Sequence, residues 1–269
     1  MAADRPSSPS GDLVTAESLA AWRLPLAGPR PPLRRSPVPD TSSRPGPADL
    51  AALIDHTLLR PDATAAEIAH LCDEAVTNGF ATVCVNPRRV AAAARLVARS
   101  GVGVTSVVGF PFGATCTDTK AYEARRAIFD GATEIDMVID LGALKDDDVA
   151  AVRRDVTAVV HVCREHGACS KIIIEAPLLT DGQKAAACTV ARDAGADFVK
   201  TSTGFAAGGA TVEDIRLMRQ VVGPAMGVKA AGGIRSYREA IALVAAGATR
   251  LGTSGSVAIL AEAAREAGR

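Results

Sequence analysis

Two lysines stand late in two successive strand-like segments, where a charged residue is costly to bury. Lys200 lies in "DFVKTST" and Lys229 lies in "MGVKAAG". The chain has only six lysines among thirty basic residues, so arginine is used wherever a positive charge alone suffices. A lysine, unlike an arginine, readily loses its proton, and burial together with a neighbouring cation lowers its pKa. The neutral amine that results can attack a carbonyl carbon and form a Schiff base.

An acidic face on another strand offers partners for these lysines. In "EIDMVID" the residues Ile135 and Met137 share one face, while Glu134, Asp136 and Asp140 share the other. The apolar face should pack under helices, so the acidic face should point into the interior of the fold. Asp136 is therefore a candidate for proton transfer, with a purely structural ion pair as the alternative.

For each lysine there is an alternative to a role in catalysis. For Lys200 this is a structural salt bridge with Asp136 or Glu175, and for Lys229 it is the binding of phosphate. Glycine-rich stretches follow the last three strand-like segments, namely "TSTG" at 201–204, "AAGGI" at 230–234 and "LGTSGS" at 251–256. Such turns let backbone N–H groups converge on an anion, and the last one opens a helix, whose N-terminus favours phosphate.

Two further polar residues near the strand ends are expected to have structural roles. Cys84 is expected to be a buried, unreactive thiol. His56 lies beside Asp55 and is expected to be a hydrogen-bonded structural residue. Arg235 and Arg250 lie near the candidate phosphate-binding stretches, but most arginines are expected to serve surface solvation.

The elements that must position these residues alternate regularly from residue 48 onward. Short apolar runs predict eight strands, at 53–57, 81–86, 103–110, 134–140, 170–176, 197–203, 226–232 and 249–254. Segments of helical period lie between and after them, at 64–78, 87–99, 117–130, 147–166, 181–194, 211–222, 236–246 and 256–267. Eight β/α units favour a closed (β/α)₈ TIM barrel, in which every parallel strand has two neighbours. The alternative, a doubly wound open sheet, usually has a Gly-rich loop after its first strand, and none is present.

Composition bounds the organisation of the chain and its partners. Residues 1–47 hold ten of the fifteen prolines and predict a disordered tail, which leaves 48–269 as the barrel domain. Acidic and basic residues balance at 30 each and aromatics are 3%, so we expect no nucleic-acid partner; balanced charge and the absence of a long apolar run likewise argue against a membrane partner. Six cysteines without a C-x-x-C pair predict reduced thiols, a cytoplasmic protein and no metal site.

Seven motifs in order resemble the deoxyribose-phosphate aldolase family of class I aldolases: "IDHTLLRPDAT", "VCVNP", "VVGFPFGA", "EIDMVID", "ADFVKTSTGF", "VKAAGGI" and "RLGTSG". The resemblance runs from about residue 50 to 260. It implies a (β/α)₈ barrel that reversibly cleaves 2-deoxy-D-ribose 5-phosphate to D-glyceraldehyde 3-phosphate and acetaldehyde, without metal or other cofactor. It also implies a small-molecule phosphosugar as partner. Relatives are often dimers or larger, so a homo-oligomer is compatible with it.

The resemblance also assigns roles to residues. Lys200 is the Schiff-base nucleophile, Lys229 tunes it, and Asp136 relays protons. The remaining assigned positions bind the substrate or its phosphate: Asp55, Cys84, Thr203, Gly204, Gly232, Gly233, Ser254 and Gly255.

Two departures from the family pattern affect this expectation. Many relatives carry a Thr after the Glu of the fifth strand, where this chain has Ala176 and Pro177. Some relatives use a C-terminal tyrosine as a proton shuttle, whereas this chain ends in "EAGR" and holds only Tyr122 and Tyr237. Two other functions stay open: a different phosphosugar enzyme on the same barrel, and a non-catalytic phosphosugar sensor with an Arg-rich tail.

Overall fold

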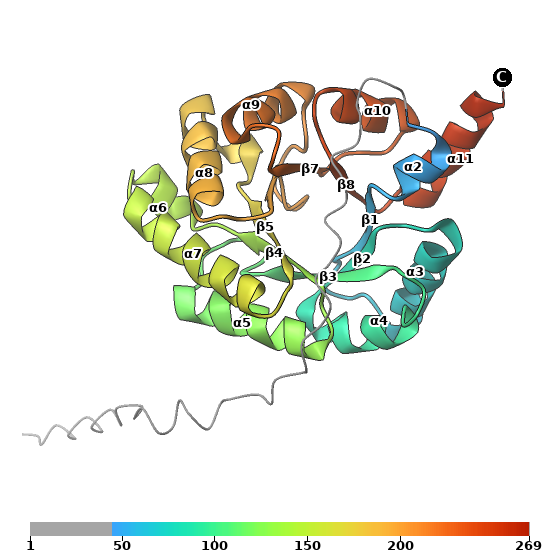
Figure 1. Cartoon of the computed structure of the whole chain (residues 1–269), viewed down its shortest axis with the longest axis horizontal. Helices are drawn as coiled ribbons and strands as arrows, with labels where there is room; N and C mark the ends of the chain where they lie inside the picture. The colour runs from blue at the N-terminus through green and yellow to red at the C-terminus, as the bar shows by residue number, and fades with distance from the viewer. Residues whose placement is uncertain (1–44, 269) are drawn as a thin grey trace, which may run out of the picture.

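Eight parallel strands form a closed barrel in the order in which they occur along the chain. The structure is a computed structural model that describes residues 45–268. Figure 1 looks into the ring of strands, with the helices arranged around its outside. The strands are β1 (Ile54–Leu58), β2 (Thr82–Val85), β3 (Gly103–Val108), β4 (Glu134–Val138), β5 (Cys169–Ile173), β6 (Phe198–Lys200), β7 (Gly227–Ala231) and β8 (Arg250–Thr253). The TIM-barrel prediction is confirmed.

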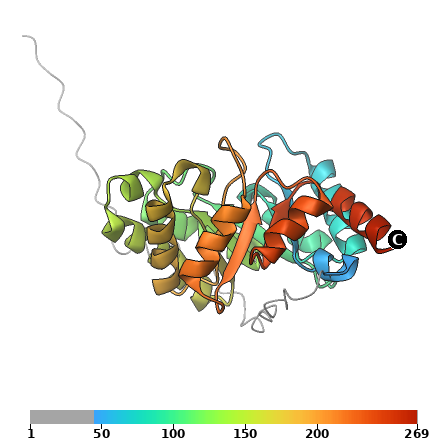
Figure 2. The ribbon, with the colours of Figure 1, turned by 90° about the horizontal axis from the view of Figure 1, so that it is seen from above.

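Helices alternate with these strands, and they run beside the strands when the ring is seen edge-on (Figure 2). The longer ones are α3 (Ala65–Asn78), α5 (Thr117–Asp130), α7 (Val149–Glu165), α8 (Asp181–Asp193), α9 (Val212–Val222), α10 (Tyr237–Ala245) and α11 (Ser256–Ala267). The shorter ones are α2 (Pro47–Ala51), η1 (Pro87–Arg89), α4 (Val90–Leu96), α6 (Leu141–Lys145) and η2 (Ala176–Leu178).

Local sequence signals explain where several helices begin and end. The Thr64 side chain caps α3 and forms a capping box with Glu67. Ser236 and Glu239 do the same for α10. Each box satisfies backbone N–H groups that have no partner inside the helix. At the other end of α3, Gly79 takes the left-handed conformation that terminates the helix at φ 68°.

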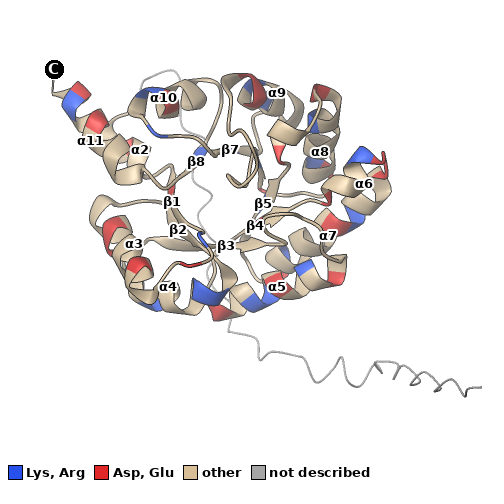
Figure 3. Cartoon of the chain, turned by 180° about the vertical axis from the view of Figure 1, so that it is seen from behind, with Lys and Arg blue, Asp and Glu red and all other residues tan. Residues whose placement is uncertain are grey.

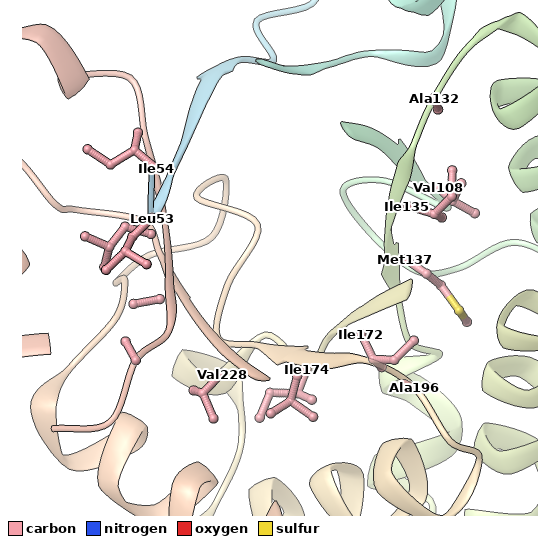
Figure 4. Close-up of a cluster of buried hydrophobic side chains, with 14 of the residues drawn as sticks. Leu53, Ile54, Val108, Ala132, Ile135, Met137, Ile172, Ile174, Ala196 and Val228 are labelled. Carbon is pink, nitrogen blue, oxygen red and sulfur yellow. The ribbon is translucent and has the colours of Figure 1, made fainter. Parts of the chain in front are cut away.

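Strand β4 shows how the alternation divides the barrel into two layers. Ile135 and Met137 are buried in the main hydrophobic cluster between strands and helices (Figure 4). Glu134 and Asp136 point the opposite way and join ion pairs inside the barrel. Asp140 was expected on that inner face, but its side chain caps α6 by accepting a hydrogen bond from the Ala143 N–H. The strand ends at Val138, and the alternation of faces ends with it.

The structure differs from the sequence-based element bounds in a few places. The helix predicted at 87–99 divides into η1 and α4, and α4 already ends at Leu96. Helices α2, α6 and η2 were not predicted, because each is three to five residues long and too short for a period to show. The predicted tail falls largely on residues 1–44, which lie outside the described residues, and α2 spans the predicted boundary at residue 47.

Charged residues lie mainly on the outer helices, as Figure 3 shows in blue and red. A second, smaller set is fully buried on the strands, and it forms the candidate site. No helix within 45–268 has both the length and the apolar character that crossing a membrane requires.

Candidate active site

Lys200 is the last residue of β6, and its side chain lies inside the barrel with 3% of its surface exposed. Its Nζ donates a hydrogen bond to Oδ2 of Asp136 at 2.8 Å. The strand puts it there because Val199, one residue earlier, belongs to the outer hydrophobic cluster. The salt bridge expected between Lys200 and Asp136 is therefore present, whereas the alternative partner Glu175 bonds elsewhere.

Lys229 lies beside Lys200, because the two residues are direct register partners on β6 and β7. Its Nζ donates to the same oxygen, Oδ2 of Asp136, at 2.7 Å. It also forms an ion pair with Asp55 of β1. The two lysines predicted to be neighbours are thus bridged by one carboxylate oxygen.

Lys171 of β5 is a third lysine in the same cluster, and it was not among the predicted site residues. Its Nζ lies 2.8 Å from Oδ1 of Asp136 and 2.5 Å from Oε2 of Glu134. Asp136 therefore accepts from a lysine at each of its two oxygens. The signal was present in "SKIIIEA", since Lys171 is a charged residue on an otherwise apolar strand, as Lys200 is.

Arg250 lies close in sequence to the glycine-rich stretch at 251–256, but the structure turns its side chain into the buried charged cluster instead. The guanidinium is buried at the start of β8, where Nη1 lies 2.7 Å from Oδ1 of Asp55 and 3.3 Å from Oε2 of Glu134. It also lies over the ring of Phe198, 5.5 Å from the ring centroid. The Arg250 side chain turns into the floor of the barrel, and its position as the first residue of β8 does not reveal this burial in the sequence.

The buried cluster contains three carboxylates and four basic groups. The carboxylates are Asp55, Glu134 and Asp136, and the basic groups are Lys171, Lys200, Lys229 and Arg250. With every group charged, this interior would carry one net positive charge. Loss of a single proton balances it, and an uncompensated charge is costly in a buried environment.

Lys200 is the basic group best placed to lose that proton. Its carboxylate partner is Asp136 alone, whereas Lys229 pairs with both Asp136 and Asp55. Burial lowers the pKa of Lys200, and the nearby charge of Lys229 lowers it further, against the attraction of Asp136. Burial also acts on Lys229, but Asp136 and Asp55 outweigh it and raise its pKa. The cluster therefore favours an amine at Lys200 and an ammonium at Lys229.

Asp55 and Asp136 are held in their ionised form. Burial alone would raise the pKa of Asp136, but Lys171, Lys200 and Lys229 outweigh it and hold that pKa well below its usual value. Burial would also raise the pKa of Asp55, but the charges of Lys229 and Arg250 outweigh it, so this pKa is lowered as well. A neutral amine beside a carboxylate and an ammonium can attack a carbonyl and exchange protons with its neighbours.

Cys84 lies at the apolar side of the barrel mouth. It is fully buried and packs with Leu59 and Val107, and Phe110 covers this cluster. Burial raises the pKa of its thiol above the usual value, which keeps the sulfur protonated. This agrees with the expectation of an unreactive buried thiol.

An aromatic contact connects two loops above this cluster. The rings of Phe110, after β3, and Phe205, after β6, meet edge to face with centroids 5.3 Å apart. Strands β4 and β5 stand between β3 and β6 in the barrel, so the contact spans part of the mouth. Phe205 is 51% exposed, so this contact lies at the rim of the mouth.

Predicted phosphate-binding glycines of the loops after β6 and β7 come together. Gly204 and Gly232 have positive φ values of 84° and 88°. A Cβ added to Gly232 would lie 3.6 Å from the Cα of Gly204 and 3.1 Å from that of Gly209, so the loops after β6 and β7 leave no comfortable room for a side chain there. Gly233 follows with a φ of 77°. Conformation favours glycine at all three positions, and at Gly232 the lack of space adds to it.

The third predicted stretch, Ser254 and Gly255, precedes helix α11. Gly255 is the N-cap residue of α11, and its N–H donates to Thr253 Oγ1 at 3.0 Å. A Cβ added to Gly255 would lie 4.0 Å from the carbonyl oxygen of Ile234, which places the loops after β7 and β8 next to each other. The Ser254 side chain is exposed.

Thr203 is held by a residue that the sequence analysis considered only as a partner for Lys200. Its N–H lies 3.2 Å from Oε1 of Glu175, and its hydroxyl donates to Oε2 of the same carboxylate. Glu175 is buried and takes the left-handed conformation at φ 51°, which is uncommon for a residue other than glycine. The next residue, Ala176, donates its N–H to the carbonyl of Thr201 at 2.8 Å.

His56 lies on β1, and its ring turns away from the charged cluster. Its Nδ1 lies 2.9 Å from the hydroxyl of Ser256, and its Nε2 lies 2.9 Å from Glu74. The expectation of a hydrogen-bonded structural histidine is confirmed. Across residues 45–268, no group of three or more His, Cys, Asp or Glu side chains is arranged to hold a metal ion.

Comparison with known proteins gives a consistent result. The family model described as "DeoC/LacD family aldolase" matches residues 50–262. A deoxyribose-phosphate aldolase of Thermococcus gammatolerans is 58% identical over 221 residues, which cover 81% of this chain and 98% of that protein. One from Rhodospirillum rubrum is 60% identical over 218 residues, covering 81% of this chain and 91% of the relative.

A solved structure shares the architecture as well. The tetrameric deoxyribose phosphate aldolase from Aeropyrum pernix superimposes with a TM-score of 0.76 at 39% sequence identity, covering 80% of this chain and 91% of that one. With a family model that spans the whole described barrel from β1 into α11, this chain belongs to the DeoC/LacD family of aldolases.

Proposed function

We propose that this protein is a deoxyribose-phosphate aldolase, which reversibly cleaves 2-deoxy-D-ribose 5-phosphate to D-glyceraldehyde 3-phosphate and acetaldehyde. The observation that carries this proposal is the shared contact of Lys200 and Lys229 with Oδ2 of Asp136 inside the barrel. It supplies a nucleophilic amine, a proton carrier and a second cation in one place. The names of the relatives in the family support the substrate.

The first half of the reaction forms the Schiff base. The neutral Nζ of Lys200 attacks C1 of the open-chain aldehyde, and the carbonyl oxygen becomes a hydroxyl as the added nitrogen gives up a proton. The hydroxyl then leaves as water after it is protonated, and a protonated imine remains. Asp136 and Lys229 are the groups within reach for these proton transfers.

The second half breaks the carbon–carbon bond. The protonated imine at C1 withdraws electrons, so removal of the proton from the C3 hydroxyl lets the C2–C3 bond break, with its electron pair passing into an enamine. Carbons C3 to C5 leave as D-glyceraldehyde 3-phosphate, in which C3 has become the aldehyde carbon, and C1 and C2 stay on Lys200 as the enamine. Protonation of the enamine and addition of water then release acetaldehyde and restore Lys200.

The remaining predicted residues fit supporting roles in this proposal. The loops after β6, β7 and β8 hold the phosphate through Gly204, Gly232, Gly233, Ser254 and Gly255. Thr203 orders the first of these loops, Asp55 keeps Lys229 charged, and Cys84 lines the pocket. In this scheme Asp136, the lysines and water carry every proton, and neither a metal nor another cofactor takes part.

We also propose a cellular location and an oligomeric state for the enzyme. We place it in the cytoplasm, because all six cysteines are free thiols. We also propose a homo-oligomer, since the relative from A. pernix is a tetramer.

A coupled assay tests the activity directly. Purified protein is mixed with 2-deoxy-D-ribose 5-phosphate, and the triose phosphate released is measured through an NADH-dependent enzyme. We expect turnover by the wild type and a loss of roughly a thousandfold or more in Lys200→Ala. Lys145→Ala is the matched control, because Lys145 is exposed on α6. Absence of cleavage by the wild type would refute the proposal.

A further inference from the structure

Ser202 has a hydroxyl that lacks a partner although it is completely buried. Within residues 45–268, the only other buried side-chain oxygen or nitrogen without a hydrogen-bond partner is Oδ1 of Asp155. The second oxygen of that carboxylate pairs with Lys120 at 2.6 Å, so Asp155 is anchored in a structural ion pair. Buried hydroxyls nearly always have a partner, and one without it beside a candidate site points to a ligand atom.

The backbone places Ser202 between the amine and the glycine loops. The extended chain continues past the end of β6, since the N–H of Thr201 donates to the carbonyl of Lys229 at 3.1 Å. In extended backbone, residues two apart face the same side, so Ser202 faces the barrel mouth as Lys200 does. A Cβ added to Gly232 would lie 3.6 Å from the Cβ of Ser202, which sets this side chain at the phosphate end of the mouth.

The residues on either side of Ser202 are fixed by other strands. The hydroxyl of Thr201 donates to the carbonyl of Ala231 on β7 at 3.0 Å. Thr203 is held by Glu175 through its N–H and its hydroxyl. Of the three consecutive hydroxyl residues, Ser202 alone keeps its hydroxyl uncommitted, while its neighbours fix where that hydroxyl stands. Because Ser202 is already held in place, binding of a ligand to its hydroxyl costs little conformational entropy.

We propose that Ser202 Oγ is a phosphate-binding group, which donates its hydrogen bond to a phosphate oxygen of the bound sugar phosphate, with Glu175 as the residue that positions it. The inference rests on the proposed function. The chemistry fits, since a hydroxyl donating to a charged phosphate oxygen makes a strong hydrogen bond. Glu175 is a carboxylate near an anion, but both of its oxygens already accept from Thr203.

Ser202→Ala tests the proposal by comparing two substrates. We measure kcat/KM for 2-deoxy-D-ribose 5-phosphate and for unphosphorylated 2-deoxy-D-ribose. The ratio of the two should fall about 10- to 100-fold, the loss expected for one hydrogen bond to a charged acceptor. Ser106→Ala is the control, because that serine is equally buried but bonds to the carbonyl of Val107 at 3.3 Å. It should leave the ratio unchanged. An unchanged ratio in Ser202→Ala overturns the proposal.

The positioning role needs a separate variant and readout. Glu175→Gln keeps the size of the side chain and one acceptor oxygen, whereas Glu175→Ala removes both. We expect the KM for the phosphorylated substrate to rise more in Glu175→Ala than in Glu175→Gln, with borohydride trapping of acetaldehyde reduced much less. Equal losses of trapping and phosphosugar turnover would overturn the role of Glu175. If the wild type cleaves neither sugar, the proposed function itself has failed, so the two failures are distinct.

Discussion

Lys200 and Lys229 donate to the same oxygen, Oδ2 of Asp136, at 2.8 and 2.7 Å. Two ammonium groups so close repel each other, and only Lys229 has a second carboxylate, Asp55, to compensate. The proton is therefore lost most easily from Lys200. This asymmetry, rather than burial alone, separates the nucleophile from its neighbour, because both lysines are almost completely buried.

Replacement of Lys229 should change the pH dependence of the reaction. The pKa of Lys200 is lowered by burial and then by Lys229, so Lys229→Leu should raise it. Only the neutral amine reacts, so kcat/KM should rise with pH through the Lys200 pKa, and this limb should move to higher pH in the variant. The rate of Schiff-base formation with acetaldehyde, measured against pH, checks the shift. Lys145→Leu should leave the profile in place, and an unmoved limb in Lys229→Leu would contradict the account.

Asp136→Asn should impair both proton transfer and stability. Three buried lysines share this carboxylate, and loss of one partner in a buried ion pair typically costs about 3–5 kcal/mol. We expect kcat to fall roughly a hundredfold or more with a smaller change in KM. Steady-state kinetics and urea unfolding measure the two effects. Asp62→Asn, at an exposed carboxylate, serves as control; if both variants unfold alike, the cluster has no structural role.

The buried carboxylates should make the protein sensitive to acid. The pKa values of Asp55 and Asp136 are lowered relative to the ordinary value of 3.8, so the unfolded chain binds protons that the folded chain does not. Their stabilisation is present above about pH 4 and is lost as pH falls toward the folded-state pKa values. The free energy of unfolding, measured from neutral pH to about pH 3, should therefore decrease, and less steeply in Asp136→Asn. Identical slopes in the two proteins would argue against this origin.

Lys171→Met should lower kcat without much effect on KM. Lys171 holds Oδ1 of Asp136 and pairs with Glu134, one level below Lys200 in the barrel. Its loss should raise the pKa of Asp136, since Lys171 is the strongest of the three attractive charges on that carboxylate. Lys184→Met, on the outer helix α8, is the matched control. A large rise in KM with kcat unchanged would show that Lys171 acts on binding instead.

The sequence pattern predicts the barrel and the two central lysines well, because both follow from local alternation. Each strand is a short apolar run, and Lys200, Lys229 and Asp136 interrupt such runs at inward positions. Lys171 obeys the same rule and could have been found by applying it to "SKIIIEA". Arg250 was harder to place, because it begins its strand and the first residue of a strand carries no alternation of its own.

Contacts between loops could not be predicted from local pattern. The hydrogen bonds from Thr203 to the Glu175 carboxylate depend on the left-handed backbone at Glu175 and on the pairing of β5 with β6. The contact of Phe110 with Phe205 joins residues 95 positions apart in sequence. The contact made at Ala176, where this chain departs from the family pattern, was likewise visible only in the structure. Its backbone N–H donates a hydrogen bond to the carbonyl of Thr201.

Borohydride trapping with acetaldehyde identifies the amine that forms the covalent bond, which we expect to be Lys200. The wild-type protein is incubated with acetaldehyde, reduced with borohydride, digested and mapped by mass spectrometry. We expect a stable two-carbon adduct on the peptide that carries Lys200, and its absence from Lys200→Ala. An adduct on Lys229 or Lys171 instead, or none on the wild type, would contradict it.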